Sequence, residues 1–311
     1  MGRKFRDSAF LLCIITVTIW LYVFGKLNKL VAKKVYVQPL CQSSKLTSFY
    51  NISTEVVSWD NVENEIRNVQ PGGHYTPKDC ISTWKVAIIV PYRDRENHLR
   101  VFLRYIHPFL QQQQLEYGIF VIEMPLNAAF NRGLLMNVGF NESKMVLNYN
   151  CFIFHDVDLL PENIKNIYKC SGHPKHMASA IDTRNYTMLY KNYFGGVNAF
   201  SKDQFTRING FPNVYFGWGR EDDDLYHRVL NANLRVQRLP LDIGRYKNLG
   251  HHRATLGEKN DKLYKTRKQR YLSDGLSNLK YTKISYELRP LYTWILIGLN
   301  NHTGQVKNEQ A

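Results

Sequence analysis

Residues 84–91 read Trp-Lys-Val-Ala-Ile-Ile-Val-Pro, an apolar run rich in β-branched side chains. Such a run is typical of a strand that is buried on both faces of a parallel sheet. Two similar runs follow at 118–123 and 151–154, and segments with helical spacing separate them at 97–110 and 134–140. The alternation of strands and helices predicts an α/β domain with a mainly parallel sheet.

Polar clusters follow each of these strands. Pro-Tyr-Arg-Asp-Arg stands at 91–95, Phe-Asn-Arg at 130–132 and Asp-Val-Asp at 156–158. Ligands of such sheets bind beyond the carboxyl ends of the strands. Arginines suit phosphate, and two carboxylates two residues apart suit a divalent cation on a diphosphate. The arginines could instead belong to an exposed basic turn, and Asp-x-Asp could occur by chance. Ligand binding is favoured because these motifs stand at the ends of predicted buried strands.

The run Gly-Trp-Gly-Arg-Glu-Asp-Asp-Asp at 217–224 places a tryptophan between glycines and ahead of four acids. Adjacent acids repel one another, and glycines permit backbone shapes that other residues resist. The run is either a solvated acidic turn or a mobile aromatic lid beside a carboxylate that moves a proton. The turn-rich segment Asn-Gly-Phe-Pro-Asn at 209–213 favours the lid.

Two further segments are candidates for ligand contact. The paired glycines 195–196 follow two aromatic residues, and they either let the backbone approach a flat ligand or form a β-bulge. His251 and His252 follow an expected short strand at 244–249, where a histidine would suit a metal site.

The chain has 311 residues and a net charge of +15. Its basic residues are scattered and no nucleic-acid motif is present, which argues against a dedicated DNA or RNA binder and leaves an anionic small molecule open.

Residues 8–25 carry no charge, which predicts a single membrane-spanning helix; a cleaved signal peptide is the alternative. Lysines and arginines flank both ends of this segment, so they do not decide its orientation. The expected organisation is a cytoplasmic tail (1–7), a signal anchor (8–25), a stem merging into the domain (26–75), the main domain (76–300) and a C-terminal tail (301–311).

Sequons and cysteines agree with export of the main domain. The candidate N-glycosylation sites are Asn51, Asn141, Asn185 and Asn301. Outside the apolar segment stand Cys41, Cys80, Cys151 and Cys170, which allow two disulfides in three connectivities. We favour nearest-neighbour pairing, Cys41–Cys80 and Cys151–Cys170. No close cysteine pair of the structural-zinc type occurs.

Together these motifs resemble the beta-1,4-galactosyltransferase family of Golgi type II membrane enzymes. The matching blocks run in order through most of the presumed lumenal part, at 86–99, 130–132, 135–140, 156–161, 193–197, 208–213, 217–224 and 272–276. Long blocks in the same order are more specific than any single motif.

The resemblance implies an α/β, Rossmann-like fold of the GT-A type, with residues 76–300 as the catalytic domain. It implies inverting transfer of galactose from UDP-galactose to the 4-hydroxyl of a terminal sugar, N-acetylglucosamine first, on glycoprotein or glycolipid glycans. The implied cofactor is Mn²⁺, and the implied partners are a UDP-sugar, a glycan acceptor and the Golgi membrane, with the catalytic domain in the lumen. The sequence leaves the oligomeric state open.

The resemblance also assigns roles residue by residue. The donor would contact Pro91, Tyr92, Arg93, Asp94, Arg95, Phe130, Asn131, Arg132, Val157, Asp158, Tyr193 and the lid Trp218. Asp222 would be the general base, and it would bind the acceptor with Glu221, Asp223 and Arg220. Asp158 and His251 would bind the metal, with Asn248 in the third ligand position. The favoured disulfide pairing matches the family pattern.

Two departures from the family pattern bear on specificity. Asn248 stands where many members have methionine, and an amide oxygen is a harder ligand, so Mg²⁺ is the alternative cation. Arg220 stands where many members have glycine, beside the acceptor carboxylates. Tyr193 matches the residue associated with galactose donors.

The alternatives are an N-acetylgalactosaminyl- or N-acetylglucosaminyltransferase, a xylose or glucose acceptor, and an inactive glycan-binding relative. A basic, membrane-tethered structural protein is disfavoured, because polar clusters lie in order at the strand ends.

Overall fold

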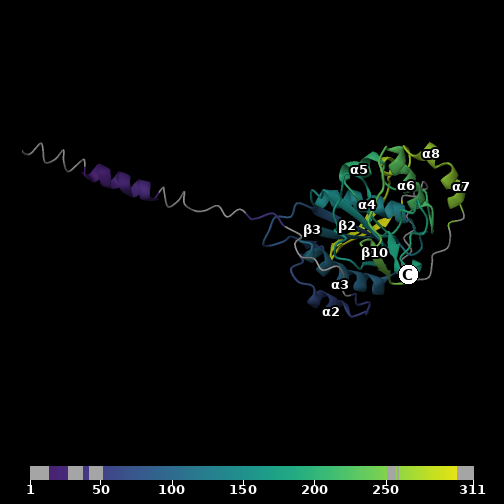
Figure 1. Ribbon diagram of the computed structural model, residues 1–311, viewed down its shortest axis with the longest axis horizontal. Helices are drawn as coiled ribbons and strands as arrows, with labels where there is room; N and C mark the ends of the chain where they lie inside the picture. Colours follow the sequence, from purple (N-terminus) through teal and green to yellow (C-terminus); the bar gives the residue numbers. More distant parts are fainter. Residues whose placement is uncertain (1–13, 27–37, 42–51, 251–256, 258, 300–311) are drawn as a thin grey trace, which may run out of the picture. The chain divides into compact units, whose positions relative to one another are not determined.

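The computed structural model describes residues 14–26, 38–41, 52–250, 257 and 259–299 (Figure 1). The chain divides into two units, Met1–Pro39 and Leu40–Ala311. In the first unit, residues 14–26 are helical. Among the described residues, no helix is both long enough and apolar enough to cross a membrane. The beginning of the expected anchor (8–13), both tails and most of residues 27–51 lie outside the described residues.

The centre of the second unit is a parallel block of four strands. In spatial order these are β12 (Thr293–Gly298), β3 (Glu116–Glu123), β2 (Lys85–Tyr92) and β4 (Cys151–His155). β2 pairs with β3 along its whole length, from Lys85 opposite Glu116 to Tyr92 opposite Glu123. All but the first residue of β2 are buried, as the apolar run predicts.

Antiparallel strands flank this block, so the sheet is mixed rather than mainly parallel as expected. β11 (Thr282–Leu288) pairs antiparallel with β12, β1 (His74–Tyr75) with β3, β8 (Val197–Phe200) with β4, and β6 (Lys175–His176) with β8. β9 (Gln237–Arg238) continues parallel to β6. The prediction was wrong here because periodicity reveals which residues are buried and not the direction in which a strand runs.

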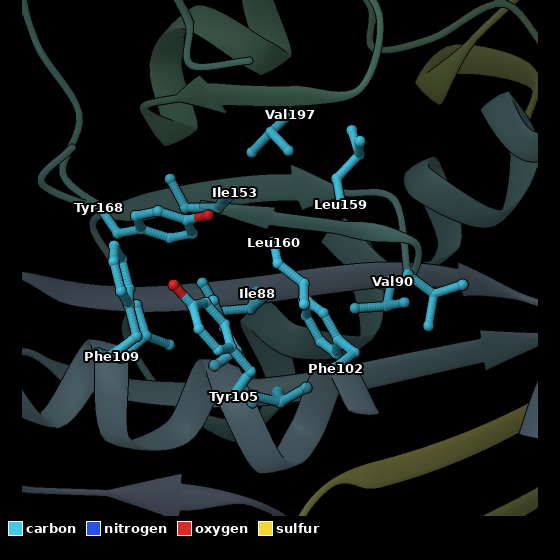
Figure 2. Packing of buried hydrophobic residues seen from close by; sticks show 14 of the residues in the cluster. Ile88, Val90, Phe102, Tyr105, Phe109, Ile153, Leu159, Leu160, Tyr168 and Val197 are labelled. Carbon is cyan, nitrogen blue, oxygen red and sulfur yellow. The ribbon is translucent and has the colours of Figure 1, made fainter. Parts of the chain in front are cut away.

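Helices cover both faces of the sheet. α3 (Glu96–Gln112) and α4 (Arg132–Val146) lie on opposite sides of β2 and β3 (Figure 1). Figure 2 shows Phe102, Tyr105 and Phe109 of α3 projecting toward the strands that carry Ile88 and Ile153. The alternate strand residues, such as Ile89, pack in a second cluster with α4 and with α6 (Glu221–Asn231).

A second sheet of three strands lies beyond the end of β4. Its central strand β10 (Arg245–Asn248) pairs with β5 (Leu159–Pro161) and β7 (Ala180–Ile181). The remaining elements are α2 (Trp59–Glu65), η1 (Asp182–Arg184), α5 (Lys202–Arg207), α7 (Asn260–Lys265), α8 (Arg267–Arg270) and η2 (Leu276–Asn278).

Both expected disulfides, Cys41–Cys80 and Cys151–Cys170, are present. The Cys151–Cys170 bond fastens the first residue of β4 to the segment that leads back to β6. The favoured nearest-neighbour pairing, which also matches the family pattern, is therefore confirmed.

Candidate active site

The ends of β2 and β3 present arginines beside aromatic rings. Pro91 and Tyr92 complete β2, and Arg93, Asp94 and Arg95 follow, with Arg95 as the N-cap residue of α3. The Arg93 guanidinium lies 5.0 Å from the centre of the Phe130 ring and donates a hydrogen bond to the Ala128 carbonyl. This pairing brings the two predicted donor-binding segments together, although they lie over 30 residues apart in the sequence.

Asn131 and Arg132 begin α4. The Asn131 side-chain oxygen accepts a hydrogen bond from the Leu134 amide at 2.9 Å, and its amide group donates to the Asn213 carbonyl at 2.6 Å. This cap fixes the start of the helix. Arg132, as the first helical residue, therefore projects from a rigid element.

Arg132 connects the end of β4 to the acidic run. Its Nε donates to Asp156 Oδ1 at 2.7 Å, and its Nη1 lies 3.7 Å from Glu221 Oε1. Burial opposes the charge of Arg132, but Asp156 and Glu221 more than offset burial and raise its pKa. Asp156 is therefore part of the site, although the roles implied by the family resemblance did not include it. Its signal was present in the Asp-Val-Asp motif.

Glu221 and Arg132 each keep one unused polar atom in the site. Arg132 Nη1 and Glu221 Oε2 are buried and have no hydrogen-bond partner in the described part of the chain. Buried polar atoms are ordinarily paired, and unpaired ones are costly. Their position between β4 and α6 suits the hydroxyl groups of a bound sugar.

Asp222 follows Glu221 in the first turn of α6 and lies against the paired glycines. A Cβ atom on Gly195 would stand 2.5 Å from Asp222 Oδ2, so any larger residue here would displace the Asp222 carboxylate. Asp222 Oδ1 accepts a hydrogen bond from the Asp223 amide at 2.9 Å. Burial raises the pKa of the Asp222 carboxyl, Asp223 raises it further, and Arg132 opposes the rise. The pKa of Glu221 is likewise raised, first by burial and then by Asp222.

Aromatic residues border these acids. The Tyr190 hydroxyl donates to Asp223 Oδ1 at 2.6 Å, and the Tyr190 ring meets the Tyr193 ring edge-on. Tyr193 is buried, and the Arg184 guanidinium lies 4.7 Å from its ring centre. The sequence interpretation selected Tyr193 and missed Tyr190, which no motif distinguished from the other tyrosines.

Trp218 is half exposed, with 52% of its surface accessible. The amide of the preceding Gly217 donates to the Phe130 carbonyl at 2.8 Å, so the tryptophan segment begins at the donor-binding loop. Arg220, in a left-handed conformation, is the N-cap residue of α6. The predicted donor and acceptor segments are therefore continuous in space.

Of the predicted metal ligands, Asn248 is the last residue of β10, and Asp158 immediately precedes β5, the strand that pairs with β10. Asn248 lies opposite Leu159, and the Leu249 amide donates to the Asp158 carbonyl at 2.9 Å. Val157 and Asp158 are buried, and Arg95 Nη1 lies 3.5 Å from Asp158 Oδ2. A carboxylate and an amide oxygen at one edge suit a hard cation such as Mn²⁺ or Mg²⁺.

Two further observations concern the predicted metal ligands Asn248 and His251. The Asn248 side-chain oxygen accepts a hydrogen bond from the Gly250 amide at 2.7 Å, so Asn248 also shapes the turn that leads toward His251. His251 lies outside the described residues, within which no group of three or more histidine, cysteine or acidic side chains could hold a metal.

The last acid of the run, Asp224, points into the protein. It is 1% exposed and accepts hydrogen bonds from Tyr215 at 2.9 Å and from Arg228 Nε at 3.0 Å. Asp274 completes the group by accepting a hydrogen bond from Arg270 Nη1 at 2.7 Å. This buried cluster connects α6 to the residues around Asp274 and does not face the site.

Comparison with family models identifies two matching regions. Residues 41–171 match the N-terminal region of glycosyl transferase group 7, and residues 175–252 match the N-terminal domain of galactosyltransferase. Together these matches include every predicted donor-binding and acceptor-binding residue named above.

Curated relatives are similar over most of the chain. Beta-1,4-galactosyltransferase 1 of Bos taurus is 47% identical over 242 residues, which cover 76% of this chain and 60% of the relative. Human beta-1,4-galactosyltransferase 6 is 42% identical over 262 residues, covering 79% of this chain and 68% of the relative. The match thus spans about three fifths of the length of the bovine relative.

A solved structure has a similar fold. The catalytic domain of Drosophila beta-1,4-galactosyltransferase 7, in complex with xylobiose, superposes with a TM-score of 0.62 at 29% identity, covering 70% of this chain and 95% of the other. A mutant of that enzyme was solved with manganese, UDP-galactose and xylobiose, and it is 28% identical with the same TM-score of 0.62 and the same coverage. The mixed α/β fold is therefore of the GT-A type.

Proposed function

The chain belongs to the beta-1,4-galactosyltransferase family, and from this we propose that it transfers galactose from UDP-galactose to the 4-hydroxyl of a terminal sugar with inversion. The donor is supported by the Drosophila relative that was solved with UDP-galactose. The first acceptor to consider is N-acetylglucosamine. Xylose is the second acceptor to consider, because the same Drosophila relative was solved in complex with xylobiose.

One observation carries this proposal: Arg132 bridges Asp156 at the end of β4 and Glu221 at the start of α6. Arg132 therefore contacts both the end of the sheet at which a GT-A enzyme would bind the nucleotide and the helix that carries the acidic run. A sugar held between them would have its diphosphate toward β4 and its reactive carbon toward Asp222.

The reaction needs a base and no covalent intermediate. The acceptor O4 attacks C1 of galactose while the bond between C1 and the β-phosphate oxygen breaks. Asp222 takes the proton of the acceptor hydroxyl, and the electron pair of the broken bond leaves with UDP. A carboxylate with a raised pKa is better matched to this proton than an ordinary aspartate.

Glu221 and Asp223 would orient the acceptor around this base. Glu221 keeps a buried oxygen that has no hydrogen-bond partner among the residues that the structure describes, and this oxygen suits a hydroxyl donor. Asp223 is held by the Tyr190 hydroxyl, so its position is set before a substrate binds. These neighbours would present the 4-hydroxyl to Asp222.

The departing diphosphate requires positive charge. Asp158, His251 and Asn248 would hold Mn²⁺ or Mg²⁺, which stabilises the charge that develops on the leaving phosphate. Arg93 and Arg95 project from the loop after β2 and suit the phosphate oxygens. Pro91, Tyr92, Asp94, Phe130, Asn131 and Val157 would complete the nucleotide pocket.

We further propose that the protein is a single-pass Golgi membrane protein with a lumenal catalytic domain. Residues 8–25 carry no charge, and the two disulfides suit an oxidising compartment. Asn185 is exposed and suits glycosylation, whereas Asn141 lies within α4 and the Ser143 of its sequon is buried. Asn51 and Asn301 lie outside the described residues.

The test is turnover by the purified full chain in detergent with Mn²⁺. UDP release from UDP-galactose should depend on an acceptor with a terminal N-acetylglucosamine. UDP-N-acetylgalactosamine and UDP-N-acetylglucosamine test the donor, and xylosyl and glucosyl acceptors test the acceptor. Failure to turn over any UDP-sugar across this panel would contradict the enzyme proposal and favour a glycan-binding relative.

A further inference from the structure

Arg220 has a backbone conformation that ordinarily requires glycine. Its φ is +81°, in the left-handed region, and it directly follows Gly219, whose φ is +104°. A long side chain is unfavourable in this conformation, so surrounding contacts must maintain it. The contacts of the Arg220 side chain can provide this stabilisation.

The Arg220 side chain joins two helices. Its Nε donates to Asp261 Oδ1 of α7 at 2.7 Å, and its Nη1 donates to Asp223 Oδ2 of α6 at 3.2 Å. Its guanidinium also lies 5.1 Å from the ring centre of Tyr264 on α7. Two carboxylates and an aromatic ring therefore already occupy this guanidinium.

The backbone beside Arg220 is held by the same helix. The Asn260 side-chain amide, at the start of α7, donates to the Phe216, Trp218 and Gly219 carbonyls at 3.2, 3.3 and 2.9 Å. The Gly257 amide donates to the Trp218 carbonyl at 3.2 Å. Asn260 is buried, whereas Asp261 keeps 61% of its side chain exposed. The tryptophan loop, residues 216–220, is therefore held to α7 by the buried, uncharged hydrogen bonds of Asn260 and by the exposed ion pair between Arg220 and Asp261.

We propose that Arg220 is a positioning residue that docks the tryptophan loop on α7 through Asp261, so that Asp222 and Asp223 are ordered before the acceptor arrives. This proposal rests on the proposed function, because it assigns Arg220 a part in acceptor recognition. It differs from the expected direct contact, since Arg220 acts through Asp261 and Asp223 rather than on the acceptor.

Docking has two measurable consequences. A loop that is ordered in advance does not incur an ordering cost on binding, so losing the contact raises the KM for the acceptor. The Arg220–Asp261 pair is exposed, so salt weakens it. The acceptor KM of the wild type should therefore rise with ionic strength.

The experiment compares Arg220→Gly, Asp261→Asn and the control Lys262→Ala in the full chain. Arg220→Gly removes the side chain and relieves the strained backbone, so lost stability does not explain its effect. Lys262→Ala removes one positive charge from the exposed side of the same helix. We expect the acceptor KM to rise about three- to tenfold in the first two variants, the range typical of coupled neighbours. It should stay at the wild-type value in the control.

Two further readouts separate docking from a general effect. The salt dependence of the acceptor KM should disappear in Arg220→Gly and Asp261→Asn, and the double variant should match Arg220→Gly alone. Hydrogen exchange of the 216–223 amides should be faster in both variants than in Lys262→Ala.

Three results would overturn the proposal. Arg220→Gly could keep the wild-type KM and exchange rates. Asp261→Asn could behave as the wild type while Arg220→Gly loses acceptor binding, which would assign a direct acceptor contact. Lys262→Ala could equal Arg220→Gly, which would indicate a general charge effect. If the wild type transfers no sugar, the proposed function fails, and hydrogen exchange still tests the docking.

Discussion

Asp222 and Asp224 stand two residues apart on α6 and have opposite surroundings. Asp222 lies against Gly195 and beside Glu221 and Asp223, with Arg132 as the cation that opposes the rise of its pKa. Asp224 accepts hydrogen bonds from Arg228 and Tyr215 in the interior. Side chains two residues apart on a helix diverge by roughly 200°. One acidic run therefore supplies both a reactive surface and an internal anchor.

The difference lies in how far each charge is neutralised. The Asp224 cluster balances two acids with two arginines, Arg228 and Arg270. On the site side, Asp156, Glu221 and Asp222 surround Arg132. Excess negative charge in a buried site favours protonation, which suits a group that must accept a proton.

The largest expected effect is on the reactive side. Asp222→Asn should lower the transfer rate about 10²- to 10⁴-fold, the usual range for losing a general base. UDP-galactose binding and the melting temperature should stay near wild type, because Asp222 takes no part in the Asp224 cluster. Steady-state kinetics, calorimetric binding and thermal unfolding test this. Turnover within about fivefold of wild type would remove Asp222 as the base.

Asp224→Asn should act on stability. It leaves Arg228 and Arg270 in the interior with only Asp274 as a counter-charge, and we expect a loss of about 3 kcal/mol in the free energy of unfolding. Denaturant unfolding measures it, with Asp222→Asn as the matched control on the same helix. A similar loss of unfolding free energy in both variants would contradict the assignment of Asp224 to stability and Asp222 to the reactive site.

The pH profile should report the raised pKa of Asp222. A base whose pKa is raised becomes protonated, and inactive, at a higher pH than an ordinary aspartate with a pKa of about 3.9. Activity should therefore fall on acidification while the protein is still folded. The measurement is kcat against pH, with thermal unfolding at each pH as the control. Full activity down to about pH 4.5 would contradict the shift.

The smallest effect comes from a matched pair of hydroxyl deletions. Tyr190 donates to Asp223 and Tyr215 donates to Asp224. Tyr190→Phe should raise the acceptor KM by about threefold with little change in melting temperature, and Tyr215→Phe should cost about 1 kcal/mol of stability with little change in KM. If Tyr190→Phe instead lowered stability and Tyr215→Phe instead raised the acceptor KM, the assignment of Asp223 to the site and Asp224 to the interior would be wrong.

Much of the scaffold could be predicted from local sequence. The strands at 84–91, 118–123 and 151–154 correspond to β2, β3 and β4, and the helices at 97–110 and 134–140 to α3 and α4. These elements were predictable because burial on both faces of a strand, or on one face of a helix, leaves a periodic apolar pattern. The direction of β8 left no such pattern, so the mixed sheet was not predicted.

The site divides in the same way. The strand-end motifs are local, and the structure brings Arg93 beside Phe130 and Arg132 beside Glu221. Asn260, which donates to three carbonyls of the tryptophan loop, belongs to no motif, because its role depends on how α7 packs. The roles assigned to Asp222, Trp218 and His251 remain predictions.

The buried strands, the acidic run and the family to which the chain belongs could all be identified from the order of the residues. A short window of the chain contains each strand and the acidic run, whereas the family is indicated by several such blocks in the same order. The folded chain was needed to show that Asp222 faces the site, that Asp224 faces the interior and that Arg220 reaches Asp261. Those outcomes depend on contacts between residues distant in sequence, because the energy of a charge is set by the groups that burial brings around it.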